Sequence, residues 1–249
     1  VVAERLFRFD IDKNLLEPLQ IIDKDMSTKK ETIGKALGGL VPYMLVIFIF
    51  LGAMYPAIDL GAGEKERGSL ETLLSSPATK FEITMGKLMV VSLTGLVSGL
   101  ISVVGITAPM YFIDNIPDQI KSTVLEIISP FMIISVVFLM IPIAIFFASM
   151  LLSISFYARS FKEAQSLMGP LNIIIIVPLM LTLGPGIEID HITALIPLIN
   201  VGLLTKEILA GSVEPIFFIE TLSSLLFFAA IGIRFSVYWF NKENTIFRV

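Results

Sequence analysis

Residues 127–158 read IISPFMIISVVFLMIPIAIFFASMLLSISFYA and contain no Asp, Glu, Lys or Arg. About 20 apolar residues in a helix are enough to cross the hydrocarbon core of a bilayer, so this stretch is long enough. Inside lipid a segment must satisfy its own backbone hydrogen bonds, and a helix does so without a partner. The stretch therefore predicts a membrane-spanning helix.

The same pattern occurs four more times along the chain. Charge-free runs cover Ala36–Ile58, Leu88–Ile113 and Ala164–Ile187. A fifth, shorter run extends past Glu220 and Arg234, because a long charged side chain can reach from a helix to the membrane surface. We predict an all-α integral membrane protein, a polytopic bundle with five transmembrane helices at about 34–58, 84–112, 128–156, 164–184 and 215–240.

The composition supports a membrane protein and excludes several classes of chemistry. Of 249 residues, 55% are hydrophobic and 16% charged, whereas soluble domains carry about 25% charged residues. The absence of Cys excludes disulfides, thiolate metal sites and cysteine nucleophiles, and one His cannot form a His-rich metal site. A net charge of −4 without a basic block argues against nucleic acid as a partner.

The loops between the spans divide the basic residues unevenly. One alternating set of short loops and span ends holds nine Lys and Arg, and the other set holds two. Because cytoplasmic loops carry the excess of basic residues, the first set is predicted to be cytoplasmic, with residues 1–32 outside and the C-terminus inside. The nine are Lys65, Arg67, Lys80, Lys87, Arg159, Lys162, Arg234, Lys242 and Arg248, and the two are Lys121 and Lys206.

The front of the chain differs from the rest. Residues 1–32 alternate charged and apolar residues, which predicts the end of an extracytoplasmic domain, followed by a transmembrane domain over 33–249. Helix starts are expected where a Thr or Ser stands three residues before a Glu, because the two side chains can bond each other's backbone N–H groups. The three pairs, each just before a span, are Thr28–Glu31, Thr79–Glu82 and Ser160–Glu163.

The segment before the last span is apolar but too short to cross. Pro197 divides it, and both of its ends are predicted to lie on the outer side. We predict an outer re-entrant hairpin at 192–209, and the alternative is an amphipathic helix lying flat on the membrane surface.

The most informative loop reads EKERGSLETLLSSP over Glu64–Pro77. Ser69 can cap the start of a short helix and Pro77 prevents its continuation, which predicts a helix at 69–76. Three leucines, Leu70, Leu73 and Leu74, then share one face. That face must be buried, either at the membrane surface or in a groove of a cytoplasmic partner.

This loop, together with EITMGK over Glu82–Lys87, resembles the first cytoplasmic loop of ABC-2-type transporter permeases. The resemblance is closest to the sodium-efflux (NatB-like) branch of that family. FKEAQ over Phe161–Gln165 is similar to the second cytoplasmic loop of the branch, and IPLINVGLL over Ile196–Leu204 is a weaker match in the hairpin. The resemblance covers about residues 33–240.

The resemblance implies a permease subunit with six spans, of which this chain lacks the first helix and most of the outer domain. It implies a bacterial or archaeal plasma membrane, a second permease copy or paralogue, and a separate ATPase subunit that binds ATP and Mg. The helix at 69–76 would be a coupling helix seated on that ATPase. The implied interface comprises Glu64, Glu66, Arg67, Ser69, Leu70, Glu71, Leu73, Leu74, Phe161 and Lys162.

The sequence indicates a transport subunit rather than an enzyme. No G-x-x-x-x-G-K-[ST] motif is present, so ATP hydrolysis is expected in the partner and no cofactor in this chain. The expected function is ATP-driven efflux of sodium or another small cation. The alternatives are an ABC exporter of hydrophobic drugs, peptides or lipids and a self-contained secondary transporter.

A few polar side chains within or near the spans are candidates for a substrate path. Each has an alternative: the small residues around Gly95-x-x-x-Gly99 suit helix packing, and Glu220 can reach the interface. The Asp190–His191 pair has no nucleophile motif beside it and is expected to be a surface feature. The path candidates are Ser98, Ser102, Asn172, Asn200 and Glu220.

Overall fold

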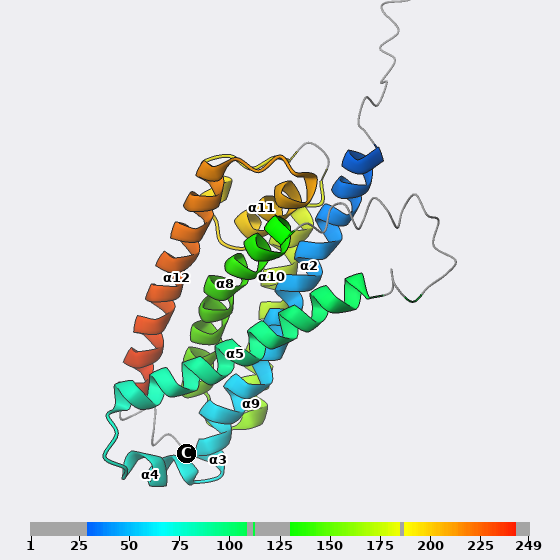
Figure 1. Cartoon of the computed structure of the whole chain (residues 1–249). Helices are drawn as coiled ribbons and strands as arrows, with labels where there is room; N and C mark the ends of the chain where they lie inside the picture. Colours follow the sequence, from blue (N-terminus) through cyan, green and yellow to red (C-terminus); the bar gives the residue numbers. More distant parts are fainter. Residues whose placement is uncertain (1–28, 109–111, 113–129, 185–186, 243–249) are drawn as a thin grey trace, which may run out of the picture.

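The computed structural model describes residues 29–108, 112, 130–184 and 187–242 (Figure 1). Within these ranges the chain is helical, and five helical segments are long and apolar enough to cross a membrane. The predicted all-α class with five spans is therefore confirmed. The spans are formed by α2 (Lys29–Ile58), α5 (Lys80–Thr107), α8 (Pro130–Tyr157), α9 (Phe161–Met168) with α10 (Leu171–Leu181), and α12 (Pro215–Asn241).

Five shorter elements connect or extend the spans. A π-helix, η2 (Asp59–Gly63), and α3 (Glu64–Glu66) prolong α2, and α4 (Ser69–Leu74) follows them. The 3₁₀ turn η3 (Thr193–Leu195) and α11 (Ile199–Ala210) precede α12. Most of the predicted outer segment 1–32, including Thr28, lies outside the described residues.

Helix α8 lies at the centre of the bundle. In Figure 1, α2 and α12 lie on either side of it, and α5 crosses obliquely in front. The main helix pairs are α2 with α5 and α12 with α8, and α8 also contacts α2 and α5. Side chains of α8 such as Phe147, Leu151 and Phe156 are almost fully buried, so the most apolar predicted span forms the core.

Small residues bring α2 and α5 close together. A Cβ added at Gly99 would lie 2.6 Å from Cγ1 of Ile49, and one at Gly52 would lie 2.1 Å from Oγ of Ser98. Such distances leave no room for a larger side chain, as is usual where two membrane helices pack through small residues. The small residues around Gly95 thus form a packing surface between α2 and α5.

The predicted helix starts are present where the structure describes them. Thr79 and Glu82 form a complete capping box at the start of α5. At the start of α9, Oγ of Ser160 accepts a hydrogen bond from N of Glu163 at 3.2 Å, but the Glu163 carboxylate accepts from N of Arg159 at 2.7 Å. The fourth span is divided at Gly169–Pro170 into α9 and α10.

Helix α11 is buried inside the bundle, mainly against α2. Asn200, Leu203, Leu204 and Thr205 have almost no exposed surface. A helix lying flat on a membrane surface would leave one face exposed, so this burial favours the re-entrant interpretation. The turn before α11 places Leu198 at φ 76°, an unfavourable conformation for a residue with a side chain, and the Leu198 side chain is buried.

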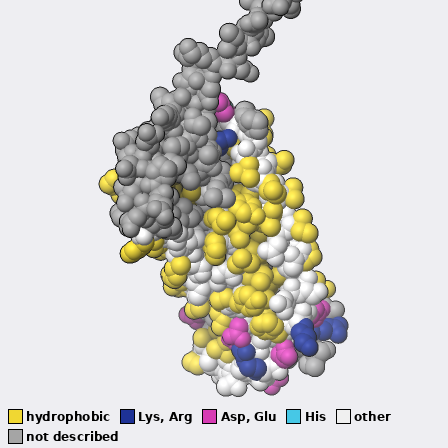
Figure 2. Space-filling model, turned by 90° about the vertical axis from the view of Figure 1, so that its right-hand side faces the viewer, with side chains coloured by type: hydrophobic (Ala, Val, Ile, Leu, Met, Phe, Trp, Pro, Cys, Tyr) yellow, Lys and Arg dark blue, Asp and Glu magenta, His cyan; other side chains and the backbone are white. Residues whose placement is uncertain are grey.

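Charged side chains gather at one end of the described bundle. Figure 2 shows one face, on which hydrophobic side chains cover the middle and most Lys, Arg, Asp and Glu lie at the end formed by α3 and α4. This end is called the charged end below. The opposite end, formed by η3 and α11, is called the hairpin end.

Candidate functional site

Helices α2, η2 and α3 follow one another without a break and extend from the bundle to the charged end. The π-helix contacts Ser155 of α8: Oγ of Ser155 accepts a hydrogen bond from N of Ala62 at 2.8 Å and donates one to O of Ile58 at 3.3 Å. A Cβ at Gly61 would lie 2.1 Å from the same Oγ. This close approach requires glycine at position 61. In the π-helix η2, which is wider than an α-helix, the Ser155 hydroxyl provides hydrogen-bond partners for N of Ala62 and O of Ile58.

Lys87 is the central buried charge of the charged end. Its side chain is 6% exposed, and Nζ donates to the carboxylate of Glu64 and to O of Leu60 at 2.5 Å. The same ammonium lies 5.9 Å from the ring centre of Phe156 and 5.7 Å from that of Phe240, within the range of a cation–π contact. One side chain of α5 thus contacts η2, α3, α8 and α12.

The next two residues of α3 bind the connection between α8 and α9. Nζ of Lys65 donates to O of Phe156 and, at 3.2 Å, to O of Ala158, at the C-terminal end of α8. The Glu66 carboxylate accepts a hydrogen bond from N of Phe161 at 2.8 Å, at the first residue of α9. A cation at a helix C-terminus and an anion at a helix N-terminus are both favoured by the helix dipole.

Arg67 stabilises the turn that leads into α4. Its guanidinium forms an ion pair with Asp59 at 2.6 Å, and both side chains are about half exposed. The hydrogen bond to Asp59 is the main reason why the pKa of Arg67 is raised above its ordinary value. Gly68 follows at φ 71°, in the left-handed region that glycine adopts without strain.

Helix α4 differs from its prediction in two respects. It ends at Leu74 rather than at residue 76, and it begins at Ser69, so Gly68 rather than Ser69 is the N-cap residue. The Ser69 hydroxyl instead donates to O of Glu64 at 3.3 Å. The helix is therefore positioned by the turn and by α3, without a side-chain cap.

The leucine face of α4 is turned toward the chain itself. Leu70 is 4% exposed, and Leu73 and Leu74 are partly buried against the hydrophobic core. We expected this face to lie on the membrane surface or in a partner's groove. Leu70 packs against the bundle, whereas Leu73 and Leu74 keep part of their surface exposed, so contact of this face with a membrane or a partner stays a prediction. Ser69, Glu71 and Thr72 stay exposed, so the accessible side of α4 is polar.

The second predicted loop motif lies beside the first. Phe161 packs partly against the core and its N–H binds Glu66, while Lys162 is exposed. The predicted interface residues of the two loops are thus adjacent. Sequence reasoning did not single out Lys65, Ser155 or Lys87 as functional, although Lys87 closes the EITMGK motif and is a charge in the first turns of a span.

The five candidates for a substrate path lie on four different helices. Ser98 and Ser102 are on α5, where Ser98 packs opposite Gly52 and Ser102 donates to O of Gly99. The Nδ2 of Asn172, at the start of α10, donates to O of Gly169. Asn200 donates to O of Ala194 within the hairpin. Each makes a local packing or hydrogen-bond contact, and the path stays a prediction.

Glu220, the fifth candidate, is paired with the single histidine. Nδ1 of His191 lies 2.9 Å from Oε1 of Glu220, and the His191 side chain is 72% exposed. The His191 ring also lies 5.3 Å from the ring of Phe217. Among the described residues no group of three or more His, Asp or Glu is arranged to hold a metal ion.

Two comparisons with known proteins found a match. The family model described as "ABC-2 family transporter protein" matches residues 10–238. The chain is 30% identical over 251 residues to the "ABC transporter permease protein NatB" of Bacillus subtilis (strain 168), covering 99% of this chain and 64% of that protein. The chain therefore spans less than two thirds of the length of this relative. No solved structure matches this chain significantly.

Proposed function

The chain belongs to the ABC-2 family of transporter proteins, and from that membership we propose that it forms the membrane-embedded part of a permease subunit in an ATP-driven exporter. A separate ATPase subunit would bind ATP and Mg, and a second permease copy or paralogue would complete the membrane part. The charged end would face the cytoplasm, because most of the basic residues that bias the topology lie there.

The observation that carries the proposal is the way α3 and α4 are joined to the bundle. Lys65 and Glu66 bind the ends of α8 and α9, and Lys87 binds Glu64 from α5. A segment attached at these points moves together with the helices that it contacts. It can therefore transmit a displacement imposed by an ATPase to the membrane helices.

The ATPase would contact the polar side of α4 rather than its leucine face. Arg67, Ser69 and Glu71 are exposed there, and Lys162 is exposed on the neighbouring α9. Charged groups at the rim of an interface direct partner choice more than they add affinity. We expect a charge reversal at Glu71 to weaken coupling while leaving the fold of the bundle intact.

For the substrate we propose sodium or another small cation, which rests on the resemblance to the sodium-efflux branch. ATP-dependent uptake into inverted vesicles that contain the full-length subunit and its ATPase tests this proposal. Sodium should accumulate with ATP, and a panel of amphipathic drugs, peptides and lipids should not. If a panel compound accumulated and sodium did not, sodium would be the wrong substrate. Uptake driven by an ion gradient in the absence of the ATPase would overturn the proposal that transport is coupled to ATP hydrolysis.

A matched pair of variants tests the coupling surface. Glu71→Arg should lower ATP-dependent transport and the ATPase activity that the permease stimulates. Glu188→Arg, the same charge reversal on an exposed residue at the hairpin end, should leave both unchanged. Equal activity of the two variants would show that α4 does not carry the contact.

A further inference from the structure

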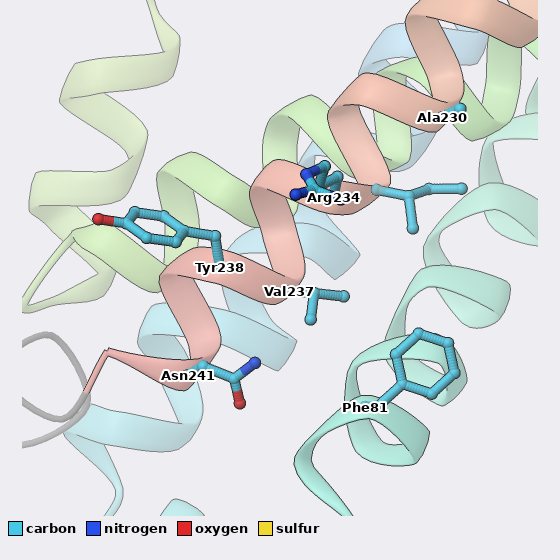
Figure 3. A pocket seen from close by; sticks show the side chains of 7 residues that line it. Phe81, Ala230, Arg234, Val237, Tyr238 and Asn241 are labelled. Atoms are coloured by element: carbon cyan, nitrogen blue, oxygen red, sulfur yellow. The ribbon is translucent and has the colours of Figure 1, made fainter.

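A groove lies between the first turn of α5 and the last turns of α12. Figure 3 shows Phe81 on α5 facing residues of α12 across it. Its volume is about 530 Å³, and it opens to the side of the bundle. Apart from Arg234, Tyr238 and Asn241, its lining is apolar. The lining residues are Phe81, Ala230, Ile233, Arg234, Val237, Tyr238 and Asn241.

Arg234 is the only charged residue of this lining, and it lies within a membrane-spanning segment. It is placed two turns before the end of α12, about 10 Å along the helix axis from Asn241. No hydrogen bond or ion pair with another described residue involves its guanidinium. The Arg234 side chain is exposed, and a charge within a membrane span is costly unless it finds a partner or reaches the membrane interface.

The acidic residue nearest to the groove along α5 is already engaged. The Glu82 carboxylate accepts hydrogen bonds from N and Oγ1 of Thr79, at 2.7 and 2.8 Å, in the capping box. Glu64 at the same end is bound to Lys87. These two carboxylates are therefore bound elsewhere, and because Arg234 is the only charged residue of the lining, the lining carries a net positive charge.

Aromatic residues indicate the level of the lipid headgroups. Tyr238 and Trp239 lie in the last turn of α12, and Nζ of Lys242 lies 5.1 Å from the Trp239 ring centre. Trp and Tyr gather where the hydrocarbon core meets the headgroups, and a long basic side chain extends from within the core to that level. The guanidinium of Arg234 can therefore reach the phosphates of the adjacent leaflet.

We propose that this groove binds the headgroup of one anionic phospholipid from the leaflet on the side of α3 and α4. The planar guanidinium of Arg234 donates two parallel hydrogen bonds to the phosphate, a geometry that arginine forms with phosphate readily. The amide of Asn241 supplies a further donor, and Tyr238 forms part of the wall. An acyl chain follows the apolar wall of Ala230 and Ile233. The proposal depends only on the membrane embedding of the chain.

Charge favours a lipid over a second copy of this chain. In a two-fold symmetric contact centred on the groove, Arg234 of one copy would face Arg234 of the other, without an acid in the lining to separate them. A free phosphate ion would satisfy the guanidinium but leave the apolar wall exposed. An anionic phospholipid complements both parts of the groove.

Native mass spectrometry of the full-length subunit, released from nanodiscs that contain phosphatidylglycerol and phosphatidylcholine, tests the proposal. The wild type should retain one phosphatidylglycerol, and Arg234→Gln should retain about fivefold less, the size of effect that one basic residue has at an anionic membrane surface. Arg234→Lys should keep most of the binding. Arg159→Gln, which removes an exposed arginine of the α8–α9 connection, should match the wild type.

Three results would overturn the proposal. The first is equal retention of phosphatidylglycerol by the wild type and Arg234→Gln. The second is displacement of the lipid by millimolar inorganic phosphate, which would identify a simple anion site. The third is a change of Arg234→Gln from dimer to monomer without a change in bound lipid, which would assign the groove to a second copy. Circular dichroism and thermal unfolding of each variant exclude a loss of fold as the cause.

Discussion

The two ends of the bundle are held together by different interactions. At the charged end, the ammonium groups of Lys65 and Lys87 bind acceptors more than 20 positions away in sequence, on other helices. At the hairpin end, Asp190 binds Thr193, three residues later, and His191 binds Glu220 with most of its own surface in solvent. A longer connection is made there by a neutral group, because the Ser224 hydroxyl of α12 donates to O of Leu195 in η3. The hairpin itself is held by the apolar burial of α11.

This difference indicates different mechanical properties. A buried charge is strongly destabilising without its partner, so the bonds at the charged end keep α3, α5 and α8 in one arrangement. Exposed ion pairs contribute little, and apolar contacts lack direction, so the hairpin end can shift without leaving a buried charge unpaired. A rigid charged end suits the transmission of force, and each prediction below tests this contrast.

The largest effect is expected from breaking the Lys87–Glu64 pair. Lys87→Met leaves the nearly buried Glu64 carboxylate without its cation, which should destabilise the subunit by about 3–5 kcal/mol. Thermal unfolding of the full-length subunit in detergent measures the loss. The control is the double variant Lys87→Met/Glu64→Leu, which removes both charges and should recover much of the stability. A single variant with wild-type stability would contradict the idea of a rigid charged end.

A smaller effect is expected where η2 contacts α8. Gly61→Ala places a methyl group against Ser155 and should cost about 1–3 kcal/mol, because the packed contact has no space for it. Gly86→Ala is the matched control: nothing lies within 4 Å of a Cβ at Gly86, so the change should stabilise α5 by about 0.5–1 kcal/mol. Opposite shifts of the unfolding temperature would confirm the contact, and shifts of the same sign would refute it.

The spans could be predicted from the sequence because hydropathy acts over a whole helix. The predicted span at 128–156 and the observed α8 agree to within two residues, and 215–240 agrees equally well with α12. The first span differs more, because the helix runs beyond Ile58 through η2 into the charged loop. That extension depends on Ser155, a residue 97 positions from Ile58, and no local pattern contains such a contact.

Helix α4 was predicted from its motif, but its orientation was not. The spacing of Leu70, Leu73 and Leu74 correctly predicted a face to be buried. It could not predict what covers that face, since an amphipathic helix has the same pattern whether it packs on its own chain, on lipid or on a partner. The pairing of Lys87 with Glu64 and of His191 with Glu220 likewise depends on helix arrangement rather than on spacing.

At the hairpin end, a modest and pH-dependent effect is expected at Glu207. Partial burial raises the pKa of this carboxyl above its ordinary value, so its contribution to stability is present at low pH and is lost as the pH rises through that raised value. Glu207→Gln should therefore raise the free energy of unfolding at pH 8 by less than about 1 kcal/mol, measured as a higher unfolding temperature, and leave it unchanged at pH 4. The same shift at both pH values would mean that charge burial is not the cause.

The smallest effect is expected at Asp190, and its sign is the reverse. Oδ1 of Asp190 accepts hydrogen bonds from N and Oγ1 of Thr193, at 2.7 Å each, and the bond from the backbone is the main reason why the pKa of Asp190 is lowered. Its contribution is present above about pH 3.9, the ordinary value, and is lost as the pH falls through the lower folded value. Hydrogen exchange of the Thr193 amide should therefore lose protection below about pH 4 in the wild type. In Asp190→Ala protection should be weak at every pH, while the amides around Lys87 stay protected in both proteins. If protection at Lys87 fell together with that at Thr193, the two ends would open as one unit and the contrast between them would be wrong.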